Sequence, residues 1–373
     1  MPTRERFNGL GSSGTEDKAA SLEPPSSYWP LDNSTLHLND GQSLEVGEPI
    51  FQRSRTSGRG TSVFRGMAGL KNVVVKCSYR PSTSRTNEAQ IVKSATDFAR
   101  ASGDSWVIRH LPAILHGEER ELGSKCHPSG NSGQEYTESG VLRIVVQEEL
   151  HRITELTTAA ELGEAFRGIF RCYRWLYEKA HIVHRDISLS NLMFRTVNGK
   201  IYGVLNDFDL SVDMNAEPRF PSDSEQRPGT LPYMALELLA PRPPPPRHFY
   251  RFDLESLFYA MLIASCHYHD GKKIEDRPFE EWQHLAPTAL CYRKNSFLNL
   301  GPVPAPTSNF ANFDDLNWDL RAMFREGFHA QAKDDYMRRQ FAHKSNFDQE
   351  TFGGLVTFDT FEQILDQHLA PLT

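Results

Sequence analysis

Residues 184–191 read His-Arg-Asp-Ile-Ser-Leu-Ser-Asn, and residues 206–209 read Asn-Asp-Phe-Asp. Asp186 and Asn191 lie five residues apart, and Asp207 follows after a short predicted hairpin. Two carboxylates and an amide can together provide oxygen atoms for a proton and for hard cations such as Mg²⁺. This combination of side chains indicates phosphoryl-transfer chemistry.

The sequence on either side of this stretch predicts a defined local structure. Upstream, apolar residues recur at steps of three and four, which predicts a helix ending just before His184. These residues are Leu162, Phe166, Ile169, Tyr173, Leu176 and Ala180. Downstream, residues 192–194 and 201–205 predict two strands joined by a turn at Asn198-Gly199. A His-Arg-Asp tripeptide alone would more simply be a surface salt bridge, but the surrounding pattern favours a functional site.

Composition and charge limit the class of protein. The chain has 373 residues, of which 39% are hydrophobic, enough for one large core or for two lobes that share an interface. A net charge of -7 and a sequence pI of 6.1 show no global basic character, so we expect no nucleic-acid partner.

The cysteines and the apolar runs predict the compartment. The five cysteines form no close pair and no metal-type spacing, which argues against a secreted disulfide framework. No apolar run approaches the roughly 20 residues of a membrane helix, and the N-terminus lacks a hydrophobic signal core. We therefore expect a cytoplasmic or nuclear protein with no membrane partner.

The first part of the chain changes character near Pro49. Residues 1–40 are rich in Gly, Ser, Pro and charge and predict a disordered extension, with a docking or phosphorylated tail as the functional alternative. Between two predicted strands, residues 57–64 read Ser-Gly-Arg-Gly-Thr-Ser-Val-Phe. Small residues such as Gly58 and Gly60 let backbone N–H groups approach phosphate oxygens, although an ordinary hairpin turn fits the same pattern.

A buried strand pattern at residues 73–75 ends in Lys76, and a helix is predicted to follow. Glu88 lies on the same face of that helix as Ile91, Ala95 and Phe98. A lone buried carboxylate is costly, so Glu88 requires a partner. Lys76 is the nearest candidate, since its own strand is also buried; a lysine that reaches the solvent is the alternative.

Two segments join the predicted strands to the helix that precedes His184. Residues 117–140 are polar and glycine-rich and predict an extended surface loop. Gln147-Glu148-Glu149-Leu150 ends the second strand and suits a hinge whose backbone meets an adenine edge. A plain connection between strand and helix remains the alternative for this segment.

The segment after Asp209 is predicted to be mostly loop. Residues 210–229 carry serines at positions 211, 222 and 224 without periodicity. Pro241–Arg247 contains four consecutive prolines and predicts a stiff polyproline II segment, either a ligand for an aromatic groove or a rigid connector. Residues 251–264 are apolar nearly all round, which predicts a buried helix whose Asp253 accepts backbone N–H groups from residues 184–186.

The order and spacing of these residues resemble the eukaryotic protein-kinase-like fold and, more closely, the fungal-type protein kinase family. The narrower match consists of His-Arg-Asp-Ile-Ser at 184–188, Asp-Phe-Asp at 207–209, Gly-Thr-Leu-Pro-Tyr-Met-Ala at 229–235 with Glu237-Leu238-Leu239, and Asp253-Leu254-Glu255-Ser256-Leu257 with Tyr259. The resemblance covers about residues 45–340 and is strongest from 145 to 262.

The resemblance implies an α+β, bilobal protein-kinase-like fold. Residues 45–148 would form a small antiparallel-sheet N-lobe with one helix, and residues 149–373 a larger, mainly helical C-lobe. It implies ATP and Mg²⁺ as cofactors and a protein substrate. It also makes residues 210–229 an activation-type loop that ends at a substrate platform.

The resemblance further implies a role for each site residue. Asp186 would accept the hydroxyl proton, and the adjacent Arg185 would pair with a phosphate on the activation-type loop. Lys76 would hold the ATP phosphates, and Glu88 would orient it. Asn191 and Asp207 would hold Mg²⁺. The remaining nucleotide contacts would come from Gly58, Gly60, Val63 and Glu148.

Three positions depart from the kinase pattern. Ser188 replaces the lysine that serine/threonine kinases place two residues after the catalytic Asp, Asp209 replaces a flexible glycine, and the glycine loop is incomplete. We therefore weigh an ATP-dependent protein Ser/Thr kinase against two alternatives, a non-catalytic kinase-fold interaction protein and a small-molecule phosphotransferase. Ser188 and Asp209 favour the interaction protein, whereas five retained polar residues favour the first hypothesis: Lys76, Glu88, Asp186, Asn191 and Asp207.

Overall fold

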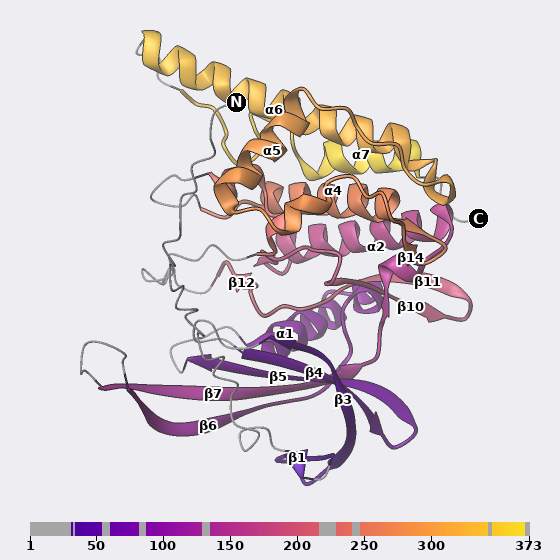
Figure 1. The fold of residues 1–373 in the computed structure, drawn as a ribbon, viewed down its shortest axis with the longest axis vertical. Coiled ribbons are helices and arrows are strands. Elements are labelled where there is room, and N and C mark those ends of the chain that lie inside the picture. Colours follow the sequence, from indigo (N-terminus) through magenta and orange to yellow (C-terminus); the bar gives the residue numbers. More distant parts are fainter. Residues whose placement is uncertain are drawn as a thin grey trace, which may run out of the picture.

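A computed structural model describes residues 31–32, 34–53, 60–81, 87–128, 135–215, 229–240, 247–341 and 345–369. In Figure 1 a curved sheet built from the first part of the chain lies below a stack of helices built from the second. The fold is therefore α+β and bilobal, as the sequence predicted. Gly58, most of Pro241–Arg247 and the serines at positions 222 and 224 lie outside the described residues.

The N-lobe is built on a seven-stranded antiparallel sheet with the order β1-β2-β3-β4-β5-β7-β6. Its strands are β1 (Leu31–Asp32), β2 (Thr35–His37), β3 (Ser43–Arg53), β4 (Gly60–Ala68), β5 (Lys71–Pro81), β6 (Ile114–Pro128) and β7 (Glu135–Glu148). Alternate apolar residues of β4, β5 and β7 form a small core that includes Phe64, Val73, Val75 and Ile144.

Two expectations for this lobe were wrong. Residues 31–40, predicted to belong to a disordered extension, contain β1 and β2, which add two antiparallel strands to the sheet. Residues 117–140, predicted to be a surface loop, lie largely in the long hairpin of β6 and β7. Their polar composition misled the prediction because a strand that extends past its lobe has little apolar surface to bury.

The helix α1 (Glu88–Ala101) joins the sheet to the C-lobe. Asn87 caps it by accepting the N–H of Gln90. Its buried stripe consists of Glu88, Val92, Ala95 and Ala99, whereas Phe98, predicted to share that face, is 43% exposed. The apolar residues of this stripe belong to the same core as the large lobe, so α1 connects Glu88 firmly to the body of the molecule.

The C-lobe consists mainly of helices. They are α2 (Ala159–Glu178), α3 (Leu236–Leu239), α4 (Tyr250–His267), α5 (Pro287–Asn299), α6 (Phe313–Phe341) and α7 (Phe358–His368), with short 3-10 helices at Ser105–His110, Ile153–Glu155, Leu231–Tyr233, Glu280–Gln283 and Ser308–Phe310. Figure 1 shows α4 stacked between α2 and the layer of α5, α6 and α7. Every residue of α4 is buried, as its apolar sequence predicted.

Short strands of the C-lobe pair in small sheets. The hairpin of β10 (Leu192–Val197) and β11 (Lys200–Leu205) turns at Asn198 and Gly199, both in the left-handed region with φ of 53° and 77°, as the sequence predicted. The other pairs are β8 (His151–Arg152) with β10, β9 (Ile182–Val183) with β12 (Val212–Asp213), and β13 (Tyr268–His269) with β14 (Lys272–Lys273).

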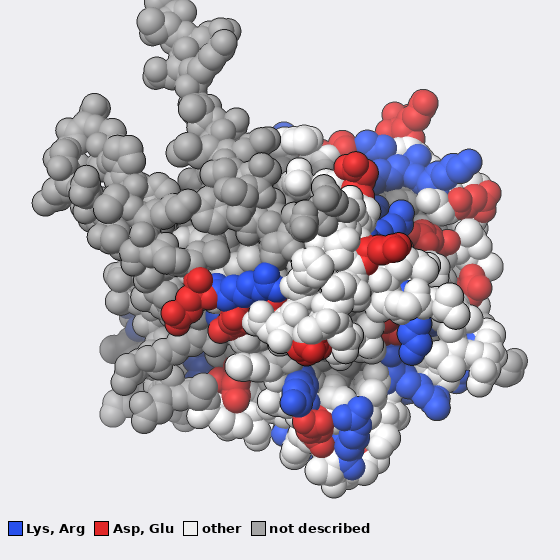
Figure 2. Space-filling model, turned by 90° about the horizontal axis from the view of Figure 1, so that it is seen from below, with Lys and Arg blue, Asp and Glu red and all other residues white. Residues whose placement is uncertain are grey.

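Basic and acidic side chains are interspersed over the described residues on the face shown in Figure 2. No helix in the described ranges is long and apolar enough to cross a membrane. The absence of a nucleic-acid partner and the compartment remain predictions.

Candidate active site

The loop that carries Asp186 is anchored from below by Asp253 of α4. The Asp253 carboxylate is buried and accepts the backbone N–H groups of His184 and Arg185 at 3.1 Å, as the sequence predicted. His248 Nε2 donates to the same carboxylate at 3.0 Å. Burial opposes ionisation, but His248 and these N–H groups together lower the pKa of Asp253 below its usual value. The ionised carboxylate therefore fixes the turn that leads to Asp186.

The backbone around the site departs from ordinary conformations at two positions. Arg185 has a φ of 72° and Asp207 a φ of 64°, both in the left-handed region that non-glycine residues rarely adopt. Such residues persist where their surroundings hold them, and they cluster at functional sites. At Arg185 the Asp253 carboxylate provides that constraint.

Asp186 lies within hydrogen-bond reach of a hydroxyl group. Thr230 donates its hydroxyl to Asp186 Oδ1 at 2.8 Å, and Asn191 Nδ2 donates to the backbone carbonyl of Asp186 at 2.8 Å and to Oδ2 at 3.2 Å. Burial and the nearby Asp207 raise the pKa of Asp186, while Thr230 and Asn191 partly oppose this shift. A carboxylate with a raised pKa that already accepts an O–H is well suited to act as a general base.

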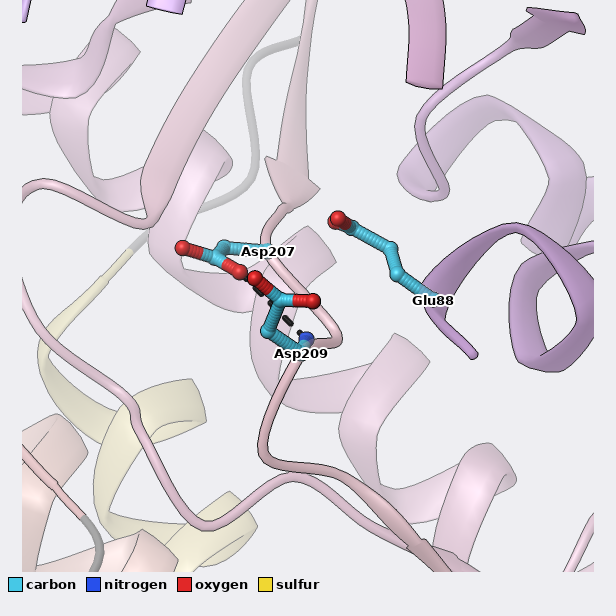
Figure 3. Close-up of side chains that lie close together, drawn as sticks. All are labelled: Glu88, Asp207 and Asp209. Atoms are coloured by element: carbon cyan, nitrogen blue, oxygen red, sulfur yellow. Dashed lines mark hydrogen bonds between the residues drawn. The ribbon is translucent and has the colours of Figure 1, made fainter. Parts of the chain in front are cut away.

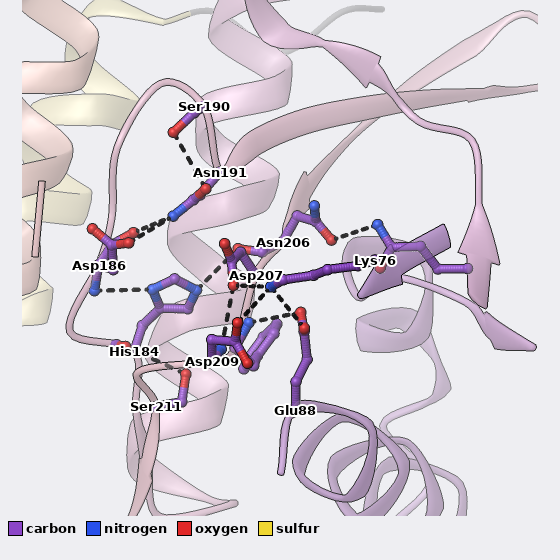
Figure 4. Close-up of polar contacts among 12 residues, drawn as sticks. Lys76, Glu88, His184, Asp186, Ser190, Asn191, Asn206, Asp207, Asp209 and Ser211 are labelled. Carbon is purple, nitrogen blue, oxygen red and sulfur yellow. Dashed lines mark hydrogen bonds and ion pairs between the residues drawn. The ribbon is translucent and has the colours of Figure 1, made fainter. Parts of the chain in front are cut away.

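The predicted pair of Lys76 and Glu88 is present, and Figure 4 shows it beside the turn that carries Asp207. Lys76 Nζ lies 2.9 Å from Glu88 Oε2 and 2.6 Å from Asp207 Oδ1. The second Glu88 oxygen accepts the backbone N–H of Phe208 at 3.0 Å. Strand β5, helix α1 and the acidic turn after β11 therefore meet at one lysine, and Glu88 contacts both other elements.

Asp209 joins this cluster, which the sequence did not predict. Its Oδ2 atom lies 2.9 Å from Lys76 Nζ and 2.5 Å from Nη2 of Arg80, a residue that the sequence analysis missed. Arg80 lies four residues after Lys76 on β5, so the alternation of the strand places both side chains on one face of the sheet. Figure 3 shows the carboxylates of Glu88, Asp207 and Asp209 gathered at this point.

The charges of this cluster shift one another. Burial alone would lower the pKa of Lys76, but the three carboxylates outweigh it and hold the pKa well above its usual value. Burial, partly offset by Lys76, raises the pKa of Glu88 to about 7. Burial would also raise the pKa of Asp209, but Lys76 and Arg80 outweigh it and lower the pKa to about 2. Asp209 therefore stays ionised at neutral pH.

Of the two predicted metal ligands, Asp207 belongs to this cluster and Asn191 lies on the segment bonded to the turn before it. Asp207 keeps a side chain that is 32% exposed, so one carboxylate face is accessible to a cation. The backbone N–H of Asn206 donates to the Asn191 carbonyl at 2.9 Å, which holds the two candidate ligand segments together. One oxygen each of Glu88, Asp207 and Asp209 lie within 4.8 Å of one another. Oxygen donors of this kind suit Mg²⁺.

The predicted nucleotide contacts are placed unevenly. Val63 pairs with Lys76 across β4 and β5, so both side chains lie on the same face of the sheet, and Gly60 begins β4 opposite Tyr79. The Glu148 carboxylate, in contrast, is paired with Arg195 and accepts the N–H of Ala113 at 3.3 Å. The Glu148 side chain is therefore occupied. Its N–H also donates to the Ala113 carbonyl at 3.2 Å, so a nucleotide contact at this residue would have to come from its backbone carbonyl.

The segment after Thr230 is bound to both α4 and α5. Lys294 donates to the Met234 carbonyl at 2.6 Å, and the Glu255 carboxylate accepts the N–H of Leu236 at 2.8 Å. Glu237 is ion-paired with Arg251, which is buried. Ser188, which replaces the usual lysine, bonds to Ser190 at 2.8 Å between hydroxyl oxygens. The partner predicted for Arg185, a phosphate on residues 210–229, falls largely outside the described residues.

Comparison with known proteins identifies the family of this chain. The sequence profile of the fungal protein kinase family matches residues 29–265, which is more than half of the 373 residues. Among solved structures, the chain is similar to the kinase PK-1 of Cydia pomonella granulovirus, at 13% sequence identity and a TM-score of 0.42, over 75% of this chain and 87% of that chain. On the extent of the profile match, the chain belongs to the fungal protein kinase family.

Proposed function

We propose that this chain is an ATP-dependent protein kinase that transfers the γ-phosphate to Ser or Thr hydroxyls of protein substrates. The observation that carries the proposal is the position of Asp186, whose carboxylate accepts the Thr230 hydroxyl at 2.8 Å. A substrate hydroxyl in the place of Thr230 would find the same acceptor. The intact Lys76–Glu88 pair provides the means to hold ATP beside it.

In this reaction Asp186 takes the proton of the substrate hydroxyl. The hydroxyl oxygen forms a bond to the γ-phosphorus, the bond from that phosphorus to the β-phosphate oxygen breaks, and ADP leaves. Lys76 binds the α- and β-phosphates while Glu88 keeps it oriented. Asn191 and Asp207 would hold Mg²⁺, which neutralises the developing phosphate charge when it is bound. We assign the adenine edge to the backbone at Glu148, and the phosphate cover to Gly58, Gly60 and Val63.

A non-catalytic kinase-fold interaction protein is the second candidate. Ser188 favours it, because the cation near the γ-phosphate is missing at that position. Retention of Lys76, Glu88, Asp186, Asn191 and Asp207 opposes it, since a scaffold has little reason to keep acidic and amide ligands together at one site. The proposal includes three further points. The N-lobe ends at residue 148 and the C-lobe begins at residue 149, and the protein is cytoplasmic or nuclear. The segment Pro241–Arg247 binds a partner that has an aromatic groove.

The test compares nucleotide binding with phosphate transfer in one preparation. Wild-type protein is incubated with MgATP labelled in the γ-phosphate and a generic protein acceptor, and phosphoamino acids are identified by mass spectrometry. We expect phosphoserine or phosphothreonine with the wild type. With Asp186→Asn we expect nearly unchanged MgATP affinity by calorimetry and transfer reduced by about a hundredfold or more, because the amide cannot accept the proton. If the wild type binds MgATP but transfers no phosphate, the interaction protein is favoured. Ser188→Lys would then be the first variant in which to test whether transfer is restored.

A further inference from the structure

The pairing of Arg80 with Asp209 has no role in the mechanism above. We propose that Arg80 is a positioning residue that holds Asp209, so that Lys76 is free to bind the phosphates of ATP. The proposal rests on the proposed function of Lys76 as the phosphate-binding lysine. It adds a residue to the site and gives a reason why an aspartate can occupy the position of the usual glycine.

The geometry shows a competition for one oxygen atom. Lys76 Nζ and Arg80 Nη2 both contact Asp209 Oδ2, at 2.9 and 2.5 Å. The side chains of Arg80 and Asp209 are only 8% and 9% exposed. Lys76 is at the same time within 2.9 Å of Glu88 and 2.6 Å of Asp207, so three carboxylates surround its single ammonium group.

Nucleotide binding must change this arrangement. An ammonium group has three donors, and phosphate oxygens can reach Lys76 only if a carboxylate gives up its contact. Glu88 is retained as the orienting residue, and Asp207 would turn its charge towards the metal. Of the three carboxylates, Asp209 is the one that loses its contact with Lys76 and gains no new ligand in exchange. Leaving it buried and unpaired would be costly, and Arg80 removes that cost because it stays bound to the same oxygen.

The same contacts make the effect of Arg80 on nucleotide affinity depend on the residue at position 209. With glycine at position 209, one carboxylate fewer would compete with the ATP phosphates for Lys76. Nucleotide binding through Lys76 would then not depend on Arg80. Arg80 therefore matters to nucleotide affinity only while Asp209 is present. A purely structural role for Arg80 would instead lower stability and affinity by the same amount whichever residue stands at position 209.

The chain offers a matched control arginine. Arg143 of β7 lies opposite Ser78 of β5, on the same face of the sheet as Lys76 and Arg80. The side chains of Arg80 and Arg143 are almost equally buried, at 8% and 7% exposure. The Arg143 ion pair is with Glu119, at 2.6 Å, and not with the acidic turn. Arg143→Gln therefore reproduces the loss of a buried arginine from this sheet face without removing a partner of Asp209.

The experiment measures MgADP affinity by calorimetry for the wild type, Arg80→Gln, Asp209→Gly, the double variant and Arg143→Gln. We expect Arg80→Gln to weaken binding by about tenfold or more, because Lys76 becomes the only cation left for Asp209. Asp209→Gly and the double variant should bind MgADP as tightly as each other and at least as tightly as the wild type. Arg143→Gln should leave the affinity within about twofold of the wild type.

Thermal melting of each variant verifies that it is folded. If Arg80→Gln does not fold, Arg80→Lys and Asp209→Asn replace it: we expect the lysine to preserve affinity and the asparagine to leave it at the wild-type value or above. Two outcomes overturn this proposal: Arg80→Gln lowers MgADP affinity equally with aspartate and with glycine at position 209, or it lowers the affinity with neither. If the wild type still binds MgADP and transfers phosphate, the proposed function is unaffected by these outcomes. A wild type that does not bind MgADP overturns the proposed function and this proposal with it.

Discussion

Replacing Asp253 by alanine should destabilise the protein more than any exposed substitution, because it removes a buried acceptor from several donors at once. The carboxylate accepts the N–H groups of His184 and Arg185 and contacts His248, all at 3.0 to 3.2 Å. Alanine leaves two backbone N–H groups of a buried turn without an acceptor. Each such group costs about 1–3 kcal/mol, so we expect a loss of about 3–5 kcal/mol in the free energy of unfolding.

The assay is urea unfolding followed by tryptophan fluorescence, with hydrogen exchange read at residues 184 and 185. A loss of this size is a large fraction of the roughly 5–15 kcal/mol that is typical of a domain, and exchange at both amides should accelerate. Asp213→Ala is the matched control, because Asp213 accepts the N–H of Asn215 at 2.9 Å on an exposed turn. We expect a change of less than about 0.5 kcal/mol there. A loss below about 1 kcal/mol for Asp253→Ala would refute the anchoring role.

Three further results are expected. Asp207→Ala should abolish the Mg²⁺-dependent part of the melting shift caused by ATP, since it removes the most accessible carboxylate of the cluster; equal shifts in wild type and variant would exclude it as a metal ligand. Burial raises the pKa of Glu88 from 4.5 to about 7, so the folded state retains a proton that the unfolded state releases, and the free energy of unfolding should fall as pH rises through that range; Glu88→Gln should lessen this slope, and an unchanged slope would contradict the shift. Phosphorylation on residues 210–229 should raise activity through Arg185, and equal activity of phosphorylated and unphosphorylated protein would exclude that switch.

The sequence predicted the parts of the site that follow from local pattern and burial. A charged residue on a buried strand or helix needs a partner. This reasoning, together with the resemblance to kinases, paired Lys76 with Glu88, and it placed Asp253 under the turn at residues 184–185. The Asn198-Gly199 turn followed in the same way from local backbone chemistry.

The contact between Arg80 and Asp209 could not be predicted from local pattern, because it joins a strand of the sheet to a turn far along the chain. The sequence distinguishes Asp209 only as the residue that replaces the usual glycine. One signal was available in retrospect. Lys76, Ser78 and Arg80 alternate on one face of a strand whose other face is apolar, so a second cation beside Lys76 was implicit in the period of two.

Because α4 is completely buried, a fragment of this chain can fold independently only if it includes the helices that cover α4. The family profile ends at residue 265, within α4, yet the helices that cover α4 on its outer side follow later in the chain. Phe258 stacks on Phe297 and Phe324, and Tyr250 stacks on Phe358. A fragment cut where the recognisable similarity stops would expose these aromatic rings and would aggregate rather than fold. The region that matches the family and the cooperative folding unit of this chain therefore have different boundaries.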